Sequence, residues 1–568
     1  MAISSLNKLS PVFFSLFVVL HFQLNVAFDS TQEAQALLKW KANLQNHSHS
    51  LISSWTLYPI NATNNSTQHR SKISHCTNWS EVSCDHAGSI HRLNLSSARL
   101  KGMLDELSFS SFPHLAYLDL SINELFGVIP AQIGNLFKLK YLDLSTNQFS
   151  GKIPIEIGLF THLETLHLAE NQLNGLIPKE IGQLISLSEL ALYSNRLNGS
   201  IPVSLGNLSN LAWLYLSNNS FSGSIPPEMG NLSNLFELYI DNNSLTGPIP
   251  SSLGNLRKLE VLHMFINQLS SSIPKELGNL ESLTYISLHS NNLSGSIPAS
   301  LGGMRSLIRV QLYNNNLSGS IPPEIGTLKN LVDLDLSKNL LSGSIPDSFK
   351  NLNKLEILYL RENHLSGTIP QEIGNFMFTK LELDTNNFTV GEIPKELGNL
   401  SLLEELILNR NQLSSGIPSE IGFLTRITRL NLSANKLRKS IPESLGNLLQ
   451  MNNLNLSNKQ FTQEIPPQLG KLSQLTKVDL SHNFISGKIP PQICDLEMLQ
   501  ELNLSHNSLS GFIPREFENM VTLSSIDISY NELEGPIPNS TAFKNAIMEE
   551  LQGNKDLCGD GLLFFRLQ

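Results

Sequence analysis

The chain has 568 residues and a formal net charge of −10, from 49 acidic and 39 basic side chains. Neutralising nucleic-acid phosphates needs a surplus of Lys and Arg on one face, so this balance argues against nucleic acid as a partner. The length alone allows several globular domains, unless an internal repeat unites the chain.

The N-terminus predicts a secretory signal peptide over residues 1–27. One positive charge, Lys8, precedes the apolar run PVFFSLFVVL, and the small Ala27 suits signal peptidase. A membrane anchor is the alternative, but this run is shorter than the ~20 residues that span a bilayer. We therefore expect export from the cell.

Residues 28–89 are predicted to form an N-terminal cap. The segment STQEAQALLKWKANL, residues 30–44, indicates a helix in which Ser30 and Glu33 make a capping box. Its apolar stripe consists of Leu37, Leu38 and Leu44.

Two cysteines of this cap lie close together in the sequence CTNWSEVSC. In an oxidising compartment, Cys76 and Cys84 at this spacing indicate a small local disulfide. With His75 and His86 they could instead hold zinc, but the spacing fits no common zinc frame. We expect neither a metal nor another cofactor.

Residues 90–538 contain a repeat. An Ile-Pro pair recurs every 24 residues from Ile129 to Ile537, eighteen times in all, and the central aliphatic residues of the predicted strands give nineteen units. Leucines at set places in a unit of this length are the signature of a leucine-rich-repeat solenoid. The fold class is therefore an α/β solenoid, a right-handed, horseshoe-like coil with a parallel sheet on its concave face.

Each unit alternates buried and exposed positions, as in LYL at residues 214–216. Because side chains alternate across a strand, Leu214 and Leu216 would point inward and Tyr215 outward. An Asn follows the strand in 17 of 19 units, where its amide can satisfy backbone groups at the turn. Lys459 replaces this Asn in one unit, and we expect its side chain to extend outward at a weaker turn.

One unit departs from the regular length. The segment IGNFMFTKLEL, residues 373–383, is a residue short, and NNFTVGEIP, residues 386–394, is a residue long. Because the two changes cancel, we expect only a local defect.

The outward positions of the strands are candidate ligand-binding residues, because they vary freely from unit to unit. In units five to twelve they are rich in rings, whereas later units carry Ser, Asn and Asp there. Exposed aromatic residues and Arg dominate binding energy in many interfaces, but neighbouring rings can also stack only to stiffen a sheet. The candidates are Tyr193, Trp213, Tyr215, Tyr239, His263, Phe265, Tyr285, His289, Tyr313, Tyr359 and Arg361.

Nineteen Asn-x-Ser/Thr sequons agree with export. The glycosylation candidates are Asn61, Asn78, Asn207, Asn231, Asn316, Asn399 and Asn539. Three further sequons, at Asn431, Asn455 and Asn503, fall between the two inward leucines of their strands. A glycan there would stand on the concave face and obstruct it, outside the zone of rings.

No catalytic residue is expected. The chain lacks the Gly-rich loop, H-R-D and D-F-G motifs of a kinase, and it has no G-x-S-x-G or H-E-x-x-H motif. The prediction is a protein that binds and does not catalyse.

Together these motifs resemble the ectodomains of plant leucine-rich-repeat receptor-like kinases, most closely the male-discoverer-interacting receptor-like kinase group. The resemblance rests on the 24-residue unit with its G-x-I-P segment, on EAQALLKWKANL and CTNWSEVSC, and on GNKDLCGD near the end. In such receptors a second cysteine, a membrane helix and a cytoplasmic kinase follow. Here Cys558 is followed by no second cysteine, so residues 539–568 are interpreted as an incomplete C-terminal cap.

The resemblance implies a receptor ectodomain that binds a secreted peptide or other extracellular ligand. It also implies a co-receptor with a shorter repeat array. The chain as written would be secreted, and a longer receptor would lie at the plasma membrane. Two other functions stay open, a free secreted binder that acts as a decoy or as an inhibitor of a wall-degrading enzyme, and a purely structural role.

Overall fold

The computed structural model describes residues 30–45, 51–56, 79–389 and 391–558. The predicted signal peptide, Cys76 and the sequons at Asn61 and Asn78 lie outside the described residues. The described chain forms two compact units, divided between Phe221 and Ser222.

Unit 1, up to Phe221, contains a main sheet whose short strands pair in parallel and in register, one strand per repeat. An additional strand, β1 (Val82–Cys84), pairs antiparallel with the first of them. The parallel strands are β2 (Ile90–Asn94), β4 (Tyr117–Asp119), β6 (Tyr141–Asp143), β8 (Thr165–His167), β10 (Glu189–Ala191) and β12 (Trp213–Tyr215).

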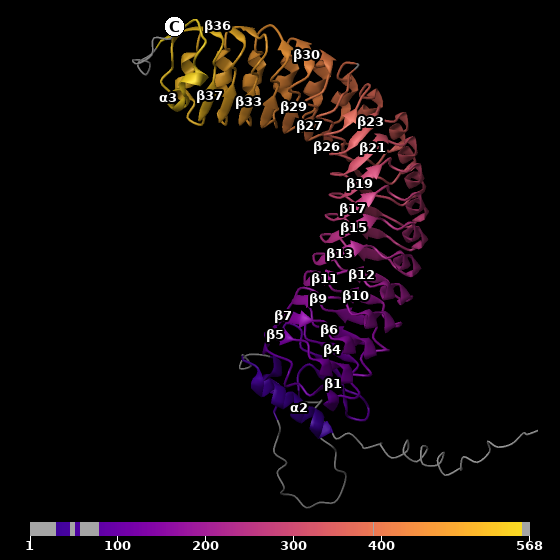
Figure 1. Cartoon of the computed structure of the whole chain (residues 1–568). Coiled ribbons are helices and arrows are strands. Elements are labelled where there is room, and N and C mark those ends of the chain that lie inside the picture. The colour runs from indigo at the N-terminus through magenta and orange to yellow at the C-terminus, as the bar shows by residue number, and fades with distance from the viewer. Residues whose placement is uncertain (1–29, 46–50, 57–78, 390, 559–568) are drawn as a thin grey trace, which may run out of the picture. The chain divides into compact units, whose positions relative to one another are not determined.

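Unit 2, from Ser222, continues the same pattern, and Figure 1 shows its main strands on the inner side of its bend. With the six strands of unit 1, its thirteen main strands confirm the nineteen predicted repeats. They are β14 (Glu237–Tyr239), β16 (Val261–His263), β18 (Tyr285–Ser287), β20 (Arg309–Gln311), β22 (Asp333–Asp335), β24 (Ile357–Tyr359), β26 (Lys380–Glu382), β27 (Glu405–Ile407), β29 (Arg429–Asn431), β31 (Asn453–Asn455), β33 (Lys477–Asp479), β35 (Glu501–Asn503) and β37 (Ser525–Asp527).

A second set of short parallel strands forms lateral sheets beside the main sheets. In unit 1 they are β3 (Lys101–Gly102), β5 (Glu124–Val128), β7 (Gln148–Lys152), β9 (Gln172–Gly175) and β11 (Arg196–Gly199), and β13 (Ser220–Ser224) spans the division. In unit 2 they are β15 (Ser244–Pro248), β17 (Gln268–Ser271), β19 (Asn292–Gly295), β21 (Asn316–Ser320), β23 (Leu340–Gly343), β25 (His364–Leu365), β28 (Ser414–Ser415), β30 (Lys436–Lys439), β32 (Gln460–Phe461), β34 (Ser486–Gly487), β36 (Ser508–Phe512), β38 (Glu532–Pro536) and β39 (Asp556–Cys558).

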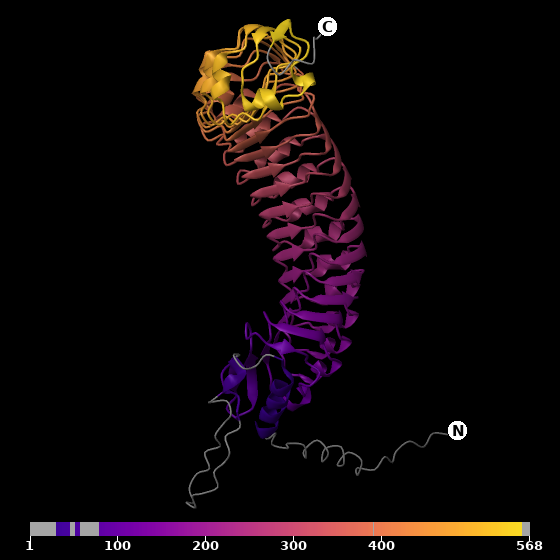
Figure 2. The same cartoon turned by 90° about the vertical axis from the view of Figure 1, so that its left-hand side faces the viewer.

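Each repeat makes one turn of coil, closed by a short 3₁₀ helix such as η8 (Pro227–Asn231). Figure 2 views the last repeats of unit 2 nearly along their stacking direction, where their backbone traces almost superimpose. The leucines inside the coils are fully buried, as Leu214 and Leu216 show at 0% exposure. Because burying one Leu contributes about 2 kcal/mol, stacked coils supply the stability that no single repeat has.

The predicted asparagine ladder is confirmed, and Asn315 shows its geometry. The Asn315 amide nitrogen donates to the carbonyls of Leu288, Leu312 and Tyr313 at 3.0, 3.1 and 3.3 Å. Its carbonyl oxygen accepts the Leu293 N–H at 3.0 Å. One buried amide thus joins two successive coils, because it satisfies backbone groups of both.

The expectation that Lys459 extends outward is wrong. Its side chain is only 5% exposed, and its ammonium nitrogen has no hydrogen-bond partner. Burial lowers the pKa of Lys459 from 10.5 to about 6. The position faces the interior in every coil, so a lysine there is held inside and loses its hydration.

The Gly before x-Ile-Pro adopts positive φ, as Gly199 does at +72°. Three consecutive repeats place Ser415, Lys439 and Gln463 at this position, with φ of 73°, 75° and 66°. A side chain in this region is strained. The same repeats form the separate lateral sheet of β28, β30 and β32. Ser271 takes this position in an earlier repeat with φ of 68°, and its strand β17 still pairs with β15 and β19, so the missing glycine does not by itself interrupt the lateral pairing.

The repeat of irregular length leaves the main sheet intact. Leu381 of β26 pairs in register with Leu358 on one side and Leu406 on the other. The lateral sheet ends at β25, and only an isolated bridge between Ser366 and Asn387 follows it. The defect is therefore local, as predicted.

The N-terminal cap begins with helix α2 (Ser30–Asn43). Glu33 does not act within this helix as the capping box predicts. Its Oε2 accepts the Ile90 N–H of β2 at 2.9 Å, and burial raises the pKa of Glu33 to about 7. This bond ties the cap to the first coil. Trp55 and Trp79 stack within the cap at 5.4 Å.

The end of the described chain consists of α3 (Thr541–Asn545), η21 (Met548–Glu550) and β39, which pairs with β38. The thiols of Cys494 and Cys558 are free, the first half-buried and the second exposed. Within the described ranges, no helix is both long and apolar enough to cross a membrane.

Candidate ligand-binding face

Three outward positions of each repeat form columns along the main sheet. The first column precedes the central aliphatic residue of the strand, the second follows it, and the third lies three residues after it. Around Leu214 they are Trp213, Tyr215 and Ser217, of which Trp213 is 38% exposed. Residues of one column lie 24 apart in regular repeats, so neighbouring repeats set them side by side.

The candidate residues of unit 1 are Tyr193, Trp213 and Tyr215. Tyr193 and Tyr215 meet edge to face, with ring centroids 6.5 Å apart. They occupy the third and second columns of adjacent repeats.

Unit 2 contains two stacks, here called the ring ladder and composed of Tyr239, His263, Tyr285, Phe265, His289 and Tyr313. In the third column, Phe265 stacks on His289 at 4.5 Å, and His289 stacks on Tyr313 at 4.1 Å. In the second column, Tyr239 stacks on His263 at 4.5 Å. Tyr285 of the first column meets His263 edge to face at 4.6 Å. His263 also meets Phe265 edge to face at 5.5 Å, so the two stacks touch.

The ladder is uncharged near neutral pH. Burial, followed by the charge of His263, lowers the pKa of His289 to about 4. Burial also lowers the pKa of His263, although Glu237 opposes this shift. Burial and nearby carboxylates raise the pKa of Tyr239 to about 12. The ladder thus offers five half-buried rings and the buried ring of His289, all neutral, whose faces are largely used by stacking.

Tyr359 and Arg361 do not join the ladder. They line a separate cavity of about 400 Å³, together with Tyr313, Asp335 and Glu382. The Arg361 Nε lies 3.2 Å from the Glu382 carboxylate. Burial raises the pKa of both Asp335 and Glu382, and Arg361 opposes the shift in each.

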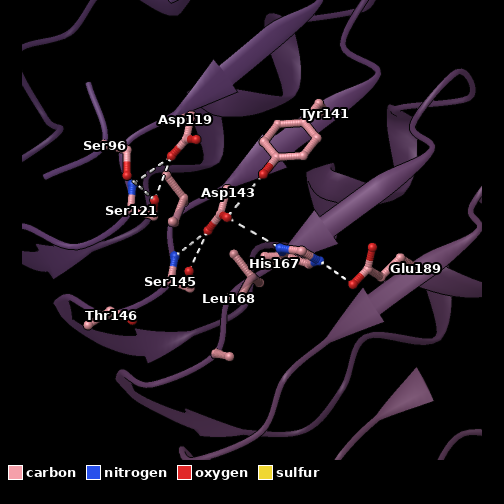
Figure 3. Close-up of polar contacts among 12 residues, drawn as sticks. Ser96, Asp119, Ser121, Tyr141, Asp143, Ser145, Thr146, His167, Leu168 and Glu189 are labelled. Atoms are coloured by element: carbon pink, nitrogen blue, oxygen red, sulfur yellow. Dashed lines mark hydrogen bonds and ion pairs between the residues drawn. The ribbon is translucent and has the colours of Figure 1, made fainter. Parts of the chain in front are cut away.

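Sequence reasoning missed a polar network on the main sheet of unit 1 (Figure 3). The His167 Nδ1 lies 3.2 Å from Asp143, and its Nε2 lies 3.0 Å from Glu189. Burial lowers the pKa of His167, but the bonds and charges of the two carboxylates outweigh it and raise this pKa to about 9. Tyr141 stacks on Tyr117 at 4.2 Å. The sequence could have predicted this network, because its residues occupy the same columns as the candidate ligand-binding residues.

A stack of exposed rings near the C-terminus was also missed. His482 stacks on His506 at 4.1 Å, and His506 stacks on Tyr530 at 4.3 Å. These residues lie one position beyond the third column, at φ of 54°, 54° and 51°. They follow the same 24-residue spacing but lie at the edge of the main sheet.

Asp or Asn in the second column often bonds the Ser two residues later. Asn455 accepts the Ser457 N–H at 3.0 Å and its hydroxyl at 2.8 Å, and Asp479 accepts the Ser481 N–H at 3.0 Å and its hydroxyl at 2.7 Å. Asn431 and Asn503 make the same pair of bonds. These three sequon asparagines are half-buried on the main sheet face, where the sequence places them. Five other sequon asparagines are exposed, namely Asn207, Asn231, Asn316, Asn399 and Asn539.

The repeats match known family models. The model described as "Leucine-rich repeat region" matches residues 90–200 and 179–320. The models "Leucine rich repeat" and "Leucine Rich Repeat" match residues 305–365 and 473–533, and residues 402–424 and 426–448.

Two curated relatives come from Arabidopsis thaliana. A probable leucine-rich repeat receptor-like protein kinase is 42% identical over 123 residues, which is 22% of this chain and 10% of the relative. MDIS1-interacting receptor like kinase 2 is 39% identical over 112 residues, which is 20% of this chain and 10% of the relative. The matched segments therefore span only about a tenth of the length of these relatives.

Solved structures align over more of the chain. The ectodomain of the Arabidopsis receptor kinase GASSHO1/SCHENGEN3, solved with CASPARIAN STRIP INTEGRITY FACTOR 2, is 34% identical with a TM-score of 0.67, over 89% of this chain and 65% of that one. The Arabidopsis receptor kinase HAESA, solved with the peptide hormone IDA and the co-receptor SERK1, is 31% identical with a TM-score of 0.63. That alignment covers 93% of this chain and 98% of HAESA. The chain belongs to the leucine-rich-repeat proteins of the plant receptor-like kinase family and corresponds to their ectodomains.

Proposed function

We propose that this protein is an extracellular, non-catalytic ectodomain of plant cell-surface signalling that senses a peptide. The observation that carries the proposal is the ring ladder of unit 2, six rings gathered on the outward side of one sheet. Five of these rings are half-buried, and rings in a fixed array offer contact area at low entropic cost. An extended chain lying across the strands meets one repeat every ~4.8 Å.

Two facts support a peptide over other ligands. Two structures that align with most of this chain are complexes, GASSHO1/SCHENGEN3 with CASPARIAN STRIP INTEGRITY FACTOR 2 and HAESA with the peptide hormone IDA. The cavity at Tyr359 on the main sheet face is also lined largely by polar groups. A long ligand fits such a face better than a compact apolar one.

The proposal extends to a partner and a location. The HAESA structure includes a co-receptor, and a co-receptor with a short repeat array is the partner we propose here. The sequons and the predicted signal peptide support a location outside the cell. Signalling would then pass through the association of two chains, because the repeats carry no catalytic group.

The test compares a ladder variant with a ring variant outside the columns. The ladder variant combines Phe265→Ala and Tyr313→Ala, and the matched control is Tyr530→Ala. Peptide fractions of apoplastic fluid are screened by the melting temperature of each protein, because a specific ligand stabilises the native state. We expect at least one fraction to raise the melting temperature of the wild type and the control, but not of the ladder variant.

Either of two results would contradict the proposal. If no fraction shifts the wild type, the face binds no peptide of that fluid and the rings serve stacking alone. If an active fraction shifts all three proteins equally, a peptide binds elsewhere. Circular dichroism of each variant before the screen establishes that the repeats remain folded.

A further inference from the structure

The third column of unit 2 has rings in its middle and unpaired acceptors at its ends. It runs from Asp241 through Phe265, His289 and Tyr313, and later reaches Asp384 and Asn409. The Oδ1 atoms of Asp241, Asp384 and Asn409 are buried and accept no hydrogen bond. Buried polar atoms are usually paired, so three open acceptors in one column indicate that something else donates to them.

Asp241 is the most informative of these three residues with an unpaired acceptor. Its side chain is 9% exposed, and burial raises the pKa of its carboxyl group to about 6, with no cation acting against the shift. Other carboxylates of this face have a basic neighbour, as Glu382 has Arg361 and Glu405 has Lys380. A buried carboxylate without a counter-charge is costly, and a bound cation would remove that cost.

Phe265 supplies the second half of the same site. His289 covers the ring face toward the following repeat, and His263 meets its edge at 5.5 Å. No other described ring stacks on the opposite face, which looks toward the repeat of Asp241. The register of β14 and β16 sets Tyr239 opposite His263, so Asp241 and Phe265, each two residues further on, are neighbours. A carboxylate beside an open aromatic face suits an ammonium or guanidinium group.

A metal ion does not fit this position. Among the described residues, no group of three or more His, Cys, Asp and Glu side chains could hold one. Asp241 is a single carboxylate next to rings, which is too few hard ligands for a cation such as Ca²⁺. An organic cation uses both the carboxylate and the ring.

The distance between Asp241 and the far end of the third column sets the length of a peptide that contacts both. Asp384 follows β26, six main strands beyond β14. At ~4.8 Å per strand this is about 29 Å, which an extended peptide spans with about nine residues at ~3.3 Å each. Asp384 and Asn409 offer two adjacent acceptors there, so a second donor group would find partners at that distance.

We propose that the ligand of this face is a basic peptide whose Lys or Arg side chain lies between Asp241 and Phe265, with a second donor-bearing residue about nine positions away at Asp384 and Asn409. This inference rests on the proposed function and names the chemistry of the peptide. The three rings between the two ends contact the segment that joins them.

The experiment selects phage-displayed random 15-residue peptides on the wild-type ectodomain and on two variants. Asp241→Asn removes the charge without changing the shape, and Glu501→Gln is the matched control, since it removes a carboxylate of the same sheet far from the ladder. We expect Lys or Arg to be enriched at one position on the wild type and on Glu501→Gln, and to lose this enrichment on Asp241→Asn.

The affinity of one selected peptide gives an independent readout. Replacing its basic residue by the neutral citrulline should weaken binding to the wild type by at least about tenfold, and should change binding to Asp241→Asn little. Equal losses on both proteins would overturn the assignment to Asp241. Enriched peptides without a preferred base would overturn this inference and leave the proposed function standing. A library with no binder on the wild type would overturn both.

Discussion

The buried lysine of the asparagine ladder allows a sharp test of how this fold is held together. Lys459 occupies the place where other repeats set an amide that joins two coils, and its ammonium nitrogen has no hydrogen-bond partner. Replacing it with Asn restores the amide, and replacing it with Met removes only the charge. Lys459→Asn and Lys459→Met therefore separate the gain of hydrogen bonds from the loss of the buried charge.

The magnitude follows from the pKa of Lys459, which burial lowers from 10.5 to about 6. Between these two values the unfolded state holds a proton that the folded state lacks, so the stability of the wild type rises with pH by about 1.4 kcal/mol per unit. The penalty is about 5 kcal/mol at pH 7 and about 2 kcal/mol at pH 9 by the same linkage. Lys459→Met should recover this penalty. Lys459→Asn should recover it too and add about 3 kcal/mol, because a ladder Asn makes four hydrogen bonds.

Hydrogen exchange measured by mass spectrometry reads this effect locally, because repeats open in separate cooperative units. Peptides from residues 452–476 should exchange more slowly in both variants than in the wild type, and peptides from residues 308–332 should not change. The advantage of Lys459→Met should shrink by about 3 kcal/mol from pH 7 to pH 9. An advantage that is absent, or equal at both pH values, would refute the account of a buried, unpaired lysine.

Two further predictions concern the hydrogen bonds of His167 and of Asn315. His167→Gln should destabilise unit 1 by about 3 kcal/mol at pH 6, because the raised pKa of His167 adds stability below its ordinary value of 6.5 that is lost as pH rises toward about 9. Urea unfolding at pH 6 and pH 9 checks this, and an equal loss at both values would contradict it. Asn315→Ala removes four hydrogen bonds and should cost about 3 kcal/mol by local hydrogen exchange. The control Asn330→Ala removes two exposed bonds, one donated to the Arg305 carbonyl and one accepted from Lys354, so a similar loss there would argue against the ladder.

The fold and the ring ladder could be predicted because the period is constant. Phe265, His289 and Tyr313 are 24 residues apart, and a repeat of that length places them on neighbouring strands wherever the coil bends. The same 24-residue spacing also predicts that Tyr117 lies beside Tyr141 and that His482 lies beside His506. These pairs were overlooked because the densest zone of rings lay between them.

The sequence could not predict interactions between residues that lie far apart along the chain. Glu33 has the spacing of a capping box, but its partner is the N–H of Ile90, 57 residues away. Lys459 has a side chain long enough to reach water, but the coil directs that position inward. Asp241 is an ordinary polar residue in the sequence, and its open carboxylate oxygen depends on which side chains surround it in the sheet.

The bond between a second-column Asp or Asn and the following Ser has an evolutionary consequence. Asp479 and Asn455 hold their serines in the same way, at nearly the same distances. An exchange of carboxylate for amide at Asp479 would leave the coil unchanged and create the sequon Asn-Leu-Ser. One substitution thus trades a negative charge for a glycan acceptor at a fixed point of the sheet. Single substitutions of this kind can change which parts of the sheet face are covered by glycans without changing the fold of the repeats.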